Sequence, residues 1–371
     1  MISWKSRLLR IFFSVAFTLL LLEAMLRYFY LLPVTAKGAY LCRHRYADHM
    51  HYPYGVGRMR TGEFNVVLTM NNIGMRDDDV GPKMPGRKRL LVIGDSFMEG
   101  WGCERGEIFT DRLEEELKAL GKDVEVVAAG VASWSTLAEA AWLRHEGFAL
   151  QPDAVLLSFD ATDCAGDSFY AHRLERDEKG RPDHIRPGRR RFDFPALIHE
   201  YLAAHSYMYR YLDRALTKKF PVTEWDYGFW AETDDVWAPM RSDSEIPDAL
   251  YESYWTRTRE ALVTMKELCD EKMIPFLLMQ HPAGVETDSS CWETGRGTAK
   301  FGPGLIAPRR FEYMQRMTDQ DSVPYFSLLD TFQRAEKPAR LFFPYDGHWS
   351  KEGHALAAEA MAAEIVRRGM I

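Results

Sequence analysis

Short apolar runs alternate with longer, helix-like segments along residues 88–371, and this alternation constrains the fold more than any other sequence feature. The runs have the length and composition of buried strands. The predicted strands are residues 90–93, 124–128, 154–159, 274–279 and 325–329. The predicted helices are residues 108–120, 136–148, 251–270 and 351–368. We therefore predict an α/β fold of three layers, with a flavodoxin-like parallel sheet of about five strands in the order 2-1-3-4-5 and helices on both faces.

The segment between the third and fourth predicted strands is unusually long. Residues 165–250 form an insertion rich in aromatic residues, proline and charge, in which we predict a helix at residues 194–216. Ordinary connections in such folds have about 2–6 residues, so the insertion needs a role of its own. The sequence leaves two roles open, a lid over the active site and a packing appendage.

The chain divides into three predicted parts. Residues 1–35 are a hydrophobic segment, residues 36–87 a connector with one strand at residues 63–70, and residues 88–371 the α/β domain with its insertion. Four connector residues have side chains that bind metals, but nothing closes a site around them, so we predict a polar loop, no metal and no cofactor. These residues are Cys42, His44, His49 and His51.

The N-terminal segment has the composition of a membrane-spanning helix. Residues 11–22 carry no charge, and residues 8–32 would form a helix about 37 Å long, enough to cross a bilayer. The basic residues before the uncharged run are Lys5, Arg7 and Arg10. We interpret the segment as an uncleaved signal anchor that leaves the catalytic domain on the exported side, periplasmic or extracellular. A signal peptide cleaved near residues 34–36 and a buried helix are the alternatives.

Charge and cysteine content argue against two classes of protein. The chain has 47 Lys and Arg against 54 Asp and Glu, a net charge of −7, so we expect no nucleic-acid partner. The basic run at residues 186–191 fits a solvated loop. Five scattered cysteines do not make a disulfide scaffold. Cys103 and Cys164 follow neighbouring strands, and we favour two buried thiols there over a disulfide.

A serine follows the first predicted strand directly, in the sequence Gly94-Asp95-Ser96. Open α/β folds bind ligands at the carboxyl edge of the sheet, and the next helix points its N-terminal N–H groups at the same edge. An oxyanion beside Ser96 would be stabilised there. The Gly-x-Ser-x-Gly turn of α/β-hydrolases is absent, because residue 98 is Met. Ser96 is the candidate nucleophile.

An acid–histidine pair lies after the fifth predicted strand. Asp346 precedes His348 by two residues, so its carboxylate can accept a hydrogen bond from one ring nitrogen and orient the imidazole. The other nitrogen is then free to take the proton from Ser96. The predicted catalytic residues are Ser96, His348 and Asp346.

These motifs resemble those of the GDSL/SGNH hydrolase family, over roughly residues 60–368. Residues 94–97 are similar to the family's first block, and the Asp-x-His pair is similar to its last block. Gly130 is similar to the glycine of the second block. The resemblance implies that Ser96 is the nucleophile and that the N–H groups of Ser96 and Gly130 belong to the oxyanion hole.

The third block departs from the family pattern. The family has Gly-x-Asn-Asp after the third strand, where this chain has Asp-Ala-Thr-Asp at residues 160–163. Thr162 stands in place of the Asn that donates its amide to the oxyanion, so Thr162 is the third predicted donor. Losing one such donor costs about 100- to 1,000-fold in rate. Either the Thr162 hydroxyl substitutes, or another group does, or the enzyme is slow.

Two further residues are candidates for substrate contact. Asp163 fits either that role or a capping and hydrogen-bonding role in the active-site wall. His281 follows the fourth predicted strand at the same sheet edge, where it is either a substrate contact or a structural residue.

The last block also points to a subgroup of the family. Asp346 stands two residues before His348, where many members have three, and Trp349 follows. This pattern is similar to the branch that includes bacterial polysaccharide O-acetylation proteins. Residues 71–76 resemble a feature of membrane-anchored bacterial members.

Three functions are compatible with the sequence. The first is a serine esterase or deacylase that acts through an acyl-serine on an acylated glycan or lipid of the cell envelope. The second is an O-acyltransferase that passes the same acyl group to polysaccharide. Its sugar-stacking aromatics would come from the insertion, namely Trp225, Tyr227, Trp230 and Trp237. The third is an envelope scaffold that keeps the fold with weakened catalysis, a reading prompted by Thr162.

Overall fold

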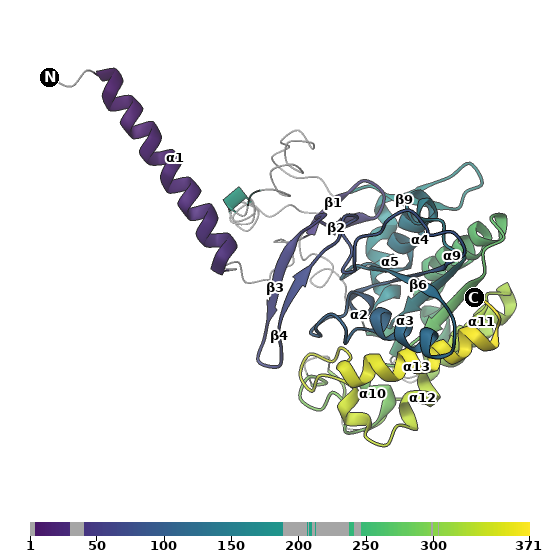
Figure 1. Cartoon of the computed structure of the whole chain (residues 1–371). Helices are drawn as coiled ribbons and strands as arrows, with labels where there is room; N and C mark the ends of the chain where they lie inside the picture. Colours follow the sequence, from purple (N-terminus) through teal and green to yellow (C-terminus); the bar gives the residue numbers. More distant parts are fainter. Residues whose placement is uncertain are drawn as a thin grey trace.

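Five parallel strands form the central sheet of the computed structural model (Figure 1). They are β5 (Lys88–Gly94), β6 (Val124–Gly130), β7 (Ala154–Phe159), β10 (Phe276–Gln280) and β11 (Tyr325–Ser327). Their order in space is β11-β10-β7-β5-β6, and every neighbouring pair is parallel. Counted along the chain, this is the order 2-1-3-4-5, so the predicted α/β fold is confirmed.

The structure describes most of the chain outside the insertion. The described residues are 4–29, 41–187, 206, 208–209, 212, 237–240, 246–297, 300–302 and 304–371. Most of the predicted helix at residues 194–216 and most of the basic run at residues 186–191 lie outside them. So do three of the insertion aromatics, namely Trp225, Tyr227 and Trp230.

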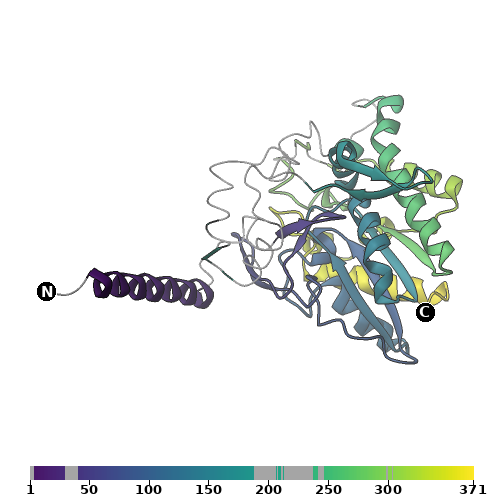
Figure 2. The same cartoon turned by 90° about the horizontal axis from the view of Figure 1, so that it is seen from above.

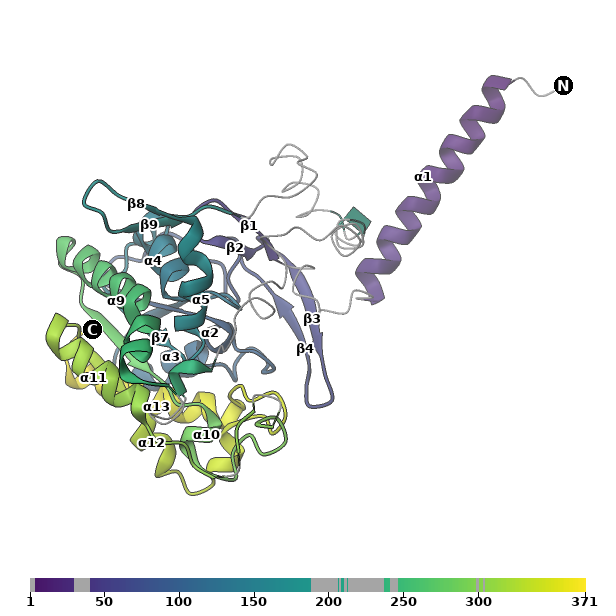
Figure 3. The same cartoon turned by 180° about the vertical axis from the view of Figure 1, so that it is seen from behind.

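Alternating side chains along the central strands build two cores, one on each face of the sheet. Leu91 and Ile93 of β5 belong to one buried cluster, and Leu90 and Val92 to the other. The first face is covered by α4 (Thr136–His145), α5 (Asp163–Tyr170) and α9 (Asp248–Glu271), which lie together in Figure 3. The second face is covered by α3 (Phe109–Ala119) and α13 (Lys351–Arg367). The helices on the first face, the sheet and the helices on the second face are the three predicted layers.

Shorter elements complete the domain around the sheet edge. The short helices are α2 (Ser96–Glu99), α10 (Gly284–Thr287) and α12 (Leu329–Gln333), and the longer α11 (Arg309–Asp321) precedes β11. Short 3₁₀ turns lie at Gly147–Leu150, Ala171–Arg173, Ala238–Met240 and Pro338–Leu341. In the insertion, β8 (Leu174–Arg176) and β9 (Pro182–Ile185) form an antiparallel hairpin against α4.

The connector contains more strands than the sequence predicted. We expected one strand, and the structure has two antiparallel pairs. The pairs are β1 (Leu41–His44) with β2 (Asp48–His51), and β3 (Val56–Arg60) with β4 (Asn65–Thr69). The β3–β4 hairpin extends as a two-stranded arm in Figure 1. Polar residues dominate β1 and β2, so these strands lack the alternation by which a strand is recognised.

The three connector histidines whose side chains could bind a metal make polar contacts with the core of the domain. His44 Nε2 lies 3.0 Å from Glu146 Oε1, and His49 Nε2 lies 2.9 Å from the Ala132 carbonyl oxygen. His51 is fully buried and pairs with Glu99 at 3.3 Å. All five cysteines are buried and free, as we predicted for Cys103 and Cys164.

Most of the N-terminal helix projects away from the α/β domain, and near its end Glu23 accepts hydrogen bonds from Ser206 Oγ at 3.0 Å and from the Met208 N–H at 2.8 Å. Helix α1 (Trp4–Phe29) projects as a single arm in Figures 1 and 2. Its residues Trp4–Leu26 are long and apolar enough to cross a membrane, and within this stretch the most apolar 18-residue window has no buried residue, whereas Leu26 at its end is buried. A membrane anchor and a signal sequence both have this form.

Candidate active site

The end of β5 places Ser96 at the carboxyl edge of the sheet. Asp95 caps the next helix, because its Oδ1 accepts a hydrogen bond of 2.9 Å from the Phe97 N–H. Ser96 is the first residue of α2, where the helix itself offers its N–H no acceptor. Gly94 is required for this tight turn, since a Cβ there would lie 2.5 Å from Cγ of Met98.

The three predicted catalytic side chains lie in one hydrogen-bonded row. Ser96 Oγ is 2.7 Å from His348 Nε2. His348 Nδ1 is 2.5 Å from Asp346 Oδ1, and Asp346 Oδ1 also accepts from the His348 backbone N–H at 3.2 Å. This is the connectivity of a nucleophile, a general base and an orienting carboxylate.

Two aromatic rings hold the imidazole between them. Trp101 stacks on His348 at 5.5 Å between ring centroids, and its Nε1 donates to Asp346 Oδ2 at 3.2 Å. Phe97 contacts His348 from a different direction, at 4.7 Å between centroids. Trp101 therefore binds the carboxylate and the imidazole at the same time, a role that the sequence did not reveal.

A carboxylate from the connector braces the loop that carries Asp346. Glu63, between β3 and β4, accepts two backbone hydrogen bonds of 2.8 Å, from the N–H groups of Tyr345 and Asp346. The neighbouring Phe64 ring packs on Phe343, with centroids 5.0 Å apart. The tip of the β3–β4 hairpin is thus fastened to the catalytic loop.

Charges around His348 favour its protonated form. Burial lowers the pKa of His348, but the Asp346 carboxylate, helped by Asp95 and Asp160, outweighs burial and leaves that pKa above its ordinary value. Burial raises the pKa of Asp346, and His348 with Trp101 brings it below the usual range. Burial, followed by the charge of Asp160, raises the pKa of Asp95 to about 7.

A small cavity of about 210 Å³ opens beside Ser96 and His348. Four tryptophans and three aspartates contribute to its wall, and among the described residues His348 is its one basic side chain. Trp237, from the insertion, is one of these tryptophans, so the insertion forms part of the site. The lining residues are Asp95, Ser96, Phe97, Trp101, Ala132, Ser133, Trp134, Asp160, Thr162, Trp237, Ala283, Trp292, Asp346, Gly347 and His348.

Gly130 is placed differently from our expectation. It pairs with Gly94 at the end of β6 and does not belong to the cavity wall. A Cβ at Gly130 would lie 2.2 Å from the Glu99 nitrogen, so glycine lets α2 pack directly on β6. The wall is formed further along, where Ser133 has a left-handed φ of 70°.

Thr162 lines the cavity, but its hydroxyl is engaged elsewhere. The Thr162 Oγ1 donates to Asp160 Oδ1 at 2.7 Å, and the Thr162 N–H donates to the same oxygen at 2.5 Å. A hydroxyl has one proton, so in this conformation it is not directed at an oxyanion. The predicted donor role of Thr162 therefore has no support in this geometry.

The two candidate substrate contacts do not reach the cavity wall. Asp163 is buried at the start of α5, where its Oδ2 accepts from the Asp160 N–H at 2.8 Å. His281 is 2% exposed and packs between Phe97 and Trp349, at 4.2 and 4.7 Å between centroids. Burial lowers the pKa of His281 well below its ordinary value. Both are buried beneath the cavity wall, which fits the structural alternative that the sequence left open for each of them.

The fold and the site together define an α/β protein with a Ser-His-Asp row at the carboxyl edge of its sheet. No family model matches the chain, and no curated protein sequence matches it.

Several solved structures are similar at low identity. The lipase/acylhydrolase from Enterococcus faecalis is 15% identical, covers 76% of this chain with 96% of its own, and has a TM-score of 0.39. An acetyl xylan esterase is 14% identical, with 75% of this chain and 99% of that chain covered and a TM-score of 0.40. A two-domain esterase active on acetylated mannans is 12% identical, with 76% and 50% covered and a TM-score of 0.37. Likenesses of this size carry no argument about activity.

Proposed function

We propose that this protein is a serine hydrolase of the GDSL/SGNH type that cleaves ester bonds through an acyl-serine intermediate. The observation that carries the proposal is the row of two short hydrogen bonds, Ser96 Oγ to His348 Nε2 and His348 Nδ1 to Asp346. A serine and a histidine with purely structural roles would not require one ring nitrogen to bind the serine hydroxyl and the other to bind a carboxylate beside a cavity. An intact row also counts against the scaffold alternative.

The geometry suggests a reaction in two steps. Ser96 Oγ attacks the ester carbonyl carbon while His348 Nε2 takes the hydroxyl proton. His348 then gives that proton to the departing alcohol oxygen as the carbon–oxygen bond breaks, leaving acyl-Ser96. A water molecule then attacks the acyl carbon while His348 takes one of its protons, and His348 returns this proton to Ser96 Oγ as the bond between the acyl carbon and Oγ breaks, which releases the acid and restores the free serine. Asp346 stabilises the imidazolium in both steps, and the Ser96 N–H at the start of α2 stabilises the oxyanion.

The size and lining of the cavity favour a short acyl group. A volume of about 210 Å³ is below the roughly 300–1,000 Å³ of sites that enclose drug-sized ligands. Tryptophan rings suit an acetyl methyl and the apolar face of a sugar. The apolar helix α1 supports an envelope substrate, and we propose an acetylated glycan or lipid on the exported side of the membrane.

Acyl transfer to a sugar hydroxyl is a second candidate, favoured by one observation. Trp237 brings the insertion into the cavity wall, where it packs on Trp292 at 5.4 Å between centroids. An aromatic wall of this kind can hold an acceptor sugar over the acyl-serine and displace water. The two candidates share Ser96, His348 and Asp346, and they differ only in the nucleophile of the second step.

The test uses the full chain in detergent with p-nitrophenyl acetate. Ser96→Ala is expected to lower kcat by about 10⁴- to 10⁶-fold, as loss of a triad nucleophile does. Ser168→Ala is the matched control, because Ser168 is exposed on α5 and its hydroxyl donates to the Cys164 carbonyl, its one hydrogen bond among the described residues. Equal activity in Ser96→Ala and the parent would refute the proposal. Adding acetyl donor with candidate glycans, and finding only free acetate, would count against transfer.

A further inference from the structure

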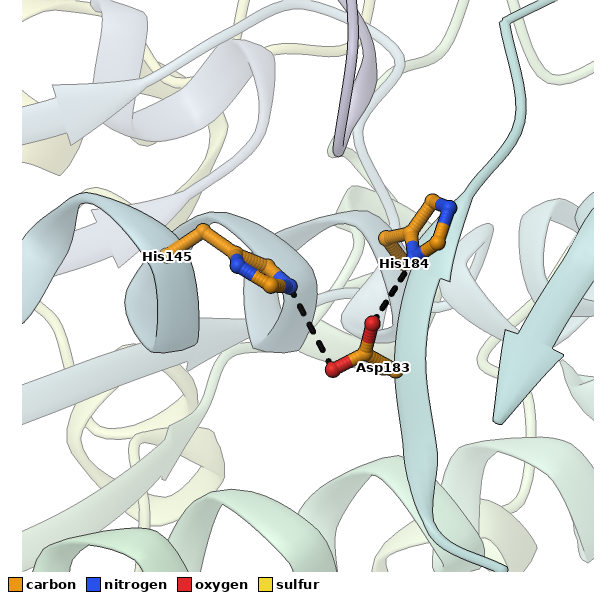
Figure 4. Close-up of side chains that lie close together, drawn as sticks. All are labelled: His145, Asp183 and His184. Carbon is orange, nitrogen blue, oxygen red and sulfur yellow. Dashed lines mark hydrogen bonds and ion pairs between the residues drawn. The ribbon is translucent and has the colours of Figure 1, made fainter. Parts of the chain in front are cut away.

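We propose that His145, Asp183 and His184 form a binding site for a divalent transition-metal ion, with zinc as the best fit. The three side chains converge at the end of α4 and on β9 (Figure 4). One ligand atom from each lies within 4.8 Å of the other two. Two imidazoles and one carboxylate are a donor set that suits zinc and its neighbours better than calcium or magnesium. The inference is independent of the proposed function.

The distances are close to those of an occupied site. His145 Nε2 lies 3.4 Å from Asp183 Oδ1, and His184 Nδ1 lies 2.7 Å from Asp183 Oδ2. Two ligands of a tetrahedral zinc ion with bonds of about 2.0–2.1 Å are separated by about 3.3 Å. The three ligand atoms all lie within 4.8 Å of one another, so binding one ion would require the two imidazoles to turn toward the same side of the Asp183 carboxylate.

His145 is prepared to act as a ligand. Its Nε2 is buried and makes no hydrogen bond within the described part of the chain. Tyr46 stacks flat on the ring at 3.8 Å between centroids, which fixes the direction of Nε2.

The surrounding charges leave room for a cation. Arg144 Nη1 lies 3.6 Å from Asp183 Oδ1, but the same nitrogen binds Asp177 Oδ2 at 3.0 Å, and Nη2 donates to the Pro182 carbonyl oxygen at 3.1 Å. Arg144 therefore keeps its own partners if the ion takes Asp183. Between 23% and 30% of each ligand side chain is exposed, which leaves a path for the ion and a fourth position for water.

The position of the site indicates a structural role. His145 ends α4 of the α/β core, and Asp183 and His184 belong to the β8–β9 hairpin of the insertion. A bound ion would fasten that hairpin to the core helix. None of the three residues lines the cavity beside Ser96, so the ion would take no part in ester cleavage.

The experiment titrates the EDTA-treated full chain in detergent with ZnCl₂ by calorimetry, and with CoCl₂ by visible absorption. We expect one equivalent of Zn²⁺ to bind, a raised Tm, and the visible bands of tetrahedral Co²⁺. His145→Ala and His184→Ala should each weaken binding at least tenfold without changing p-nitrophenyl acetate hydrolysis. His172→Ala is the matched control, since His172 lies exposed in the same insertion, near the hairpin.

Two outcomes would overturn the inference. One is binding by the His145→Ala and His184→Ala variants as tight as that of the parent, which would leave only a hydrogen-bonded cluster. The other is a parent protein without a stoichiometric heat, Tm shift or Co²⁺ spectrum. The second outcome needs no variant, so it decides the question even if a substitution prevents folding.

Discussion

His348 is the residue whose titration controls the proposed reaction. Only the neutral imidazole can take the proton from Ser96, and neighbouring carboxylates hold the His348 pKa above its ordinary value of about 6.5. We therefore expect kcat/KM for p-nitrophenyl acetate to fall as the pH drops, with a midpoint above 6.5. Asp346→Asn removes the largest of these carboxylate effects, so the midpoint should move to lower pH while kcat falls by about 10⁴-fold.

Other titrating groups near the site can be separated from His348. His354 has its pKa lowered to about 3 by burial, so it does not titrate in this range. Asp95 does, because burial raises its pKa to about 7. The Asp95→Asn variant keeps a side-chain cap for α2, and the acidic fall in activity should persist in it. A pH-independent rate in Asp95→Asn would assign the fall to Asp95 instead.

Substitution of Thr162 tests whether its hydroxyl replaces the Asn side-chain amide that serves as an oxyanion donor in GDSL/SGNH hydrolases. Its hydroxyl donates to Asp160, so Thr162→Val should lower kcat by less than about threefold. A true oxyanion donor would cost about 100- to 1,000-fold. Single-turnover acylation with p-nitrophenyl acetate measures the step concerned. A loss of 100-fold, with the fold intact by circular dichroism, would show that the hydroxyl turns to the oxyanion during the reaction.

At the scale of single residues, the sequence predicted those site residues whose roles follow from short local motifs. Ser96 follows a strand, and Asp346 and His348 are two residues apart, so all three could be predicted before their contacts were known. Trp101 and Glu63 could not, because their roles depend on contacts with residues more than 200 positions away. Gly130 was chosen from the block pattern, whereas the backbone beside the cavity is that of Ser133, whose left-handed φ has no sequence signal.

At the scale of elements, the β3–β4 hairpin is a part of the catalytic apparatus. Glu63 accepts from two consecutive N–H groups of the loop that presents Asp346. We expect Glu63→Ala to lower kcat about 10- to 100-fold with little change in KM, because a loosened Asp346 orients His348 poorly. Glu63→Gln should retain part of the activity, since its amide oxygen can still accept one of the two bonds.

The control for this prediction lies on the same hairpin. Asn65 is exposed on β4 and bonds only Arg58 across the hairpin, so Asn65→Ala should leave kcat unchanged. If Glu63→Ala lowers the Tm and kcat together while Glu63→Gln matches the parent in both, the residue stabilises the fold and does not position Asp346. A kcat loss at unchanged Tm would support positioning.

The elements that were predicted correctly share one physical property. Four of the five central strands are buried along most of their length, so they appear in the sequence as nearly continuous apolar runs, and β11 at the sheet edge is half-buried. The strands of the connector are short and polar and gain their stability from contacts with the core, such as the buried pair of His51 with Glu99. Helix α2 has only four residues and depends on its Asp95 cap, so it is too short to show the helical periodicity of apolar residues by which a helix is predicted.

At the scale of the whole molecule, the site is assembled from every part of the chain that the structure describes beyond α1. The core supplies Ser96 and His348, the connector braces Asp346 through Glu63, and the insertion adds Trp237 to the cavity wall. The connector follows α1 directly in the sequence. A brace that joins the connector to the catalytic loop would therefore keep the active site close to whatever surface holds α1.

This arrangement leads to a prediction about the anchor. The full chain should sediment with membranes, resist extraction by salt and alkali, and dissolve in detergent, because Trp4–Leu26 is long and apolar enough to span a bilayer. A chain lacking residues 1–36 should be soluble and should hydrolyse p-nitrophenyl acetate at the parent rate, since α1 contributes nothing to the cavity wall.

The same preparation tests the proposed orientation. Protease added outside intact spheroplasts should digest the catalytic domain and spare a cytoplasmic marker, because the positive N-terminus is expected to stay inside. Mass spectrometry of the membrane-bound chain should find residues 1–30 still attached. A soluble exported form that begins near residue 36 would show a cleaved signal peptide instead, and protection from protease would place the esterase site on the cytoplasmic side.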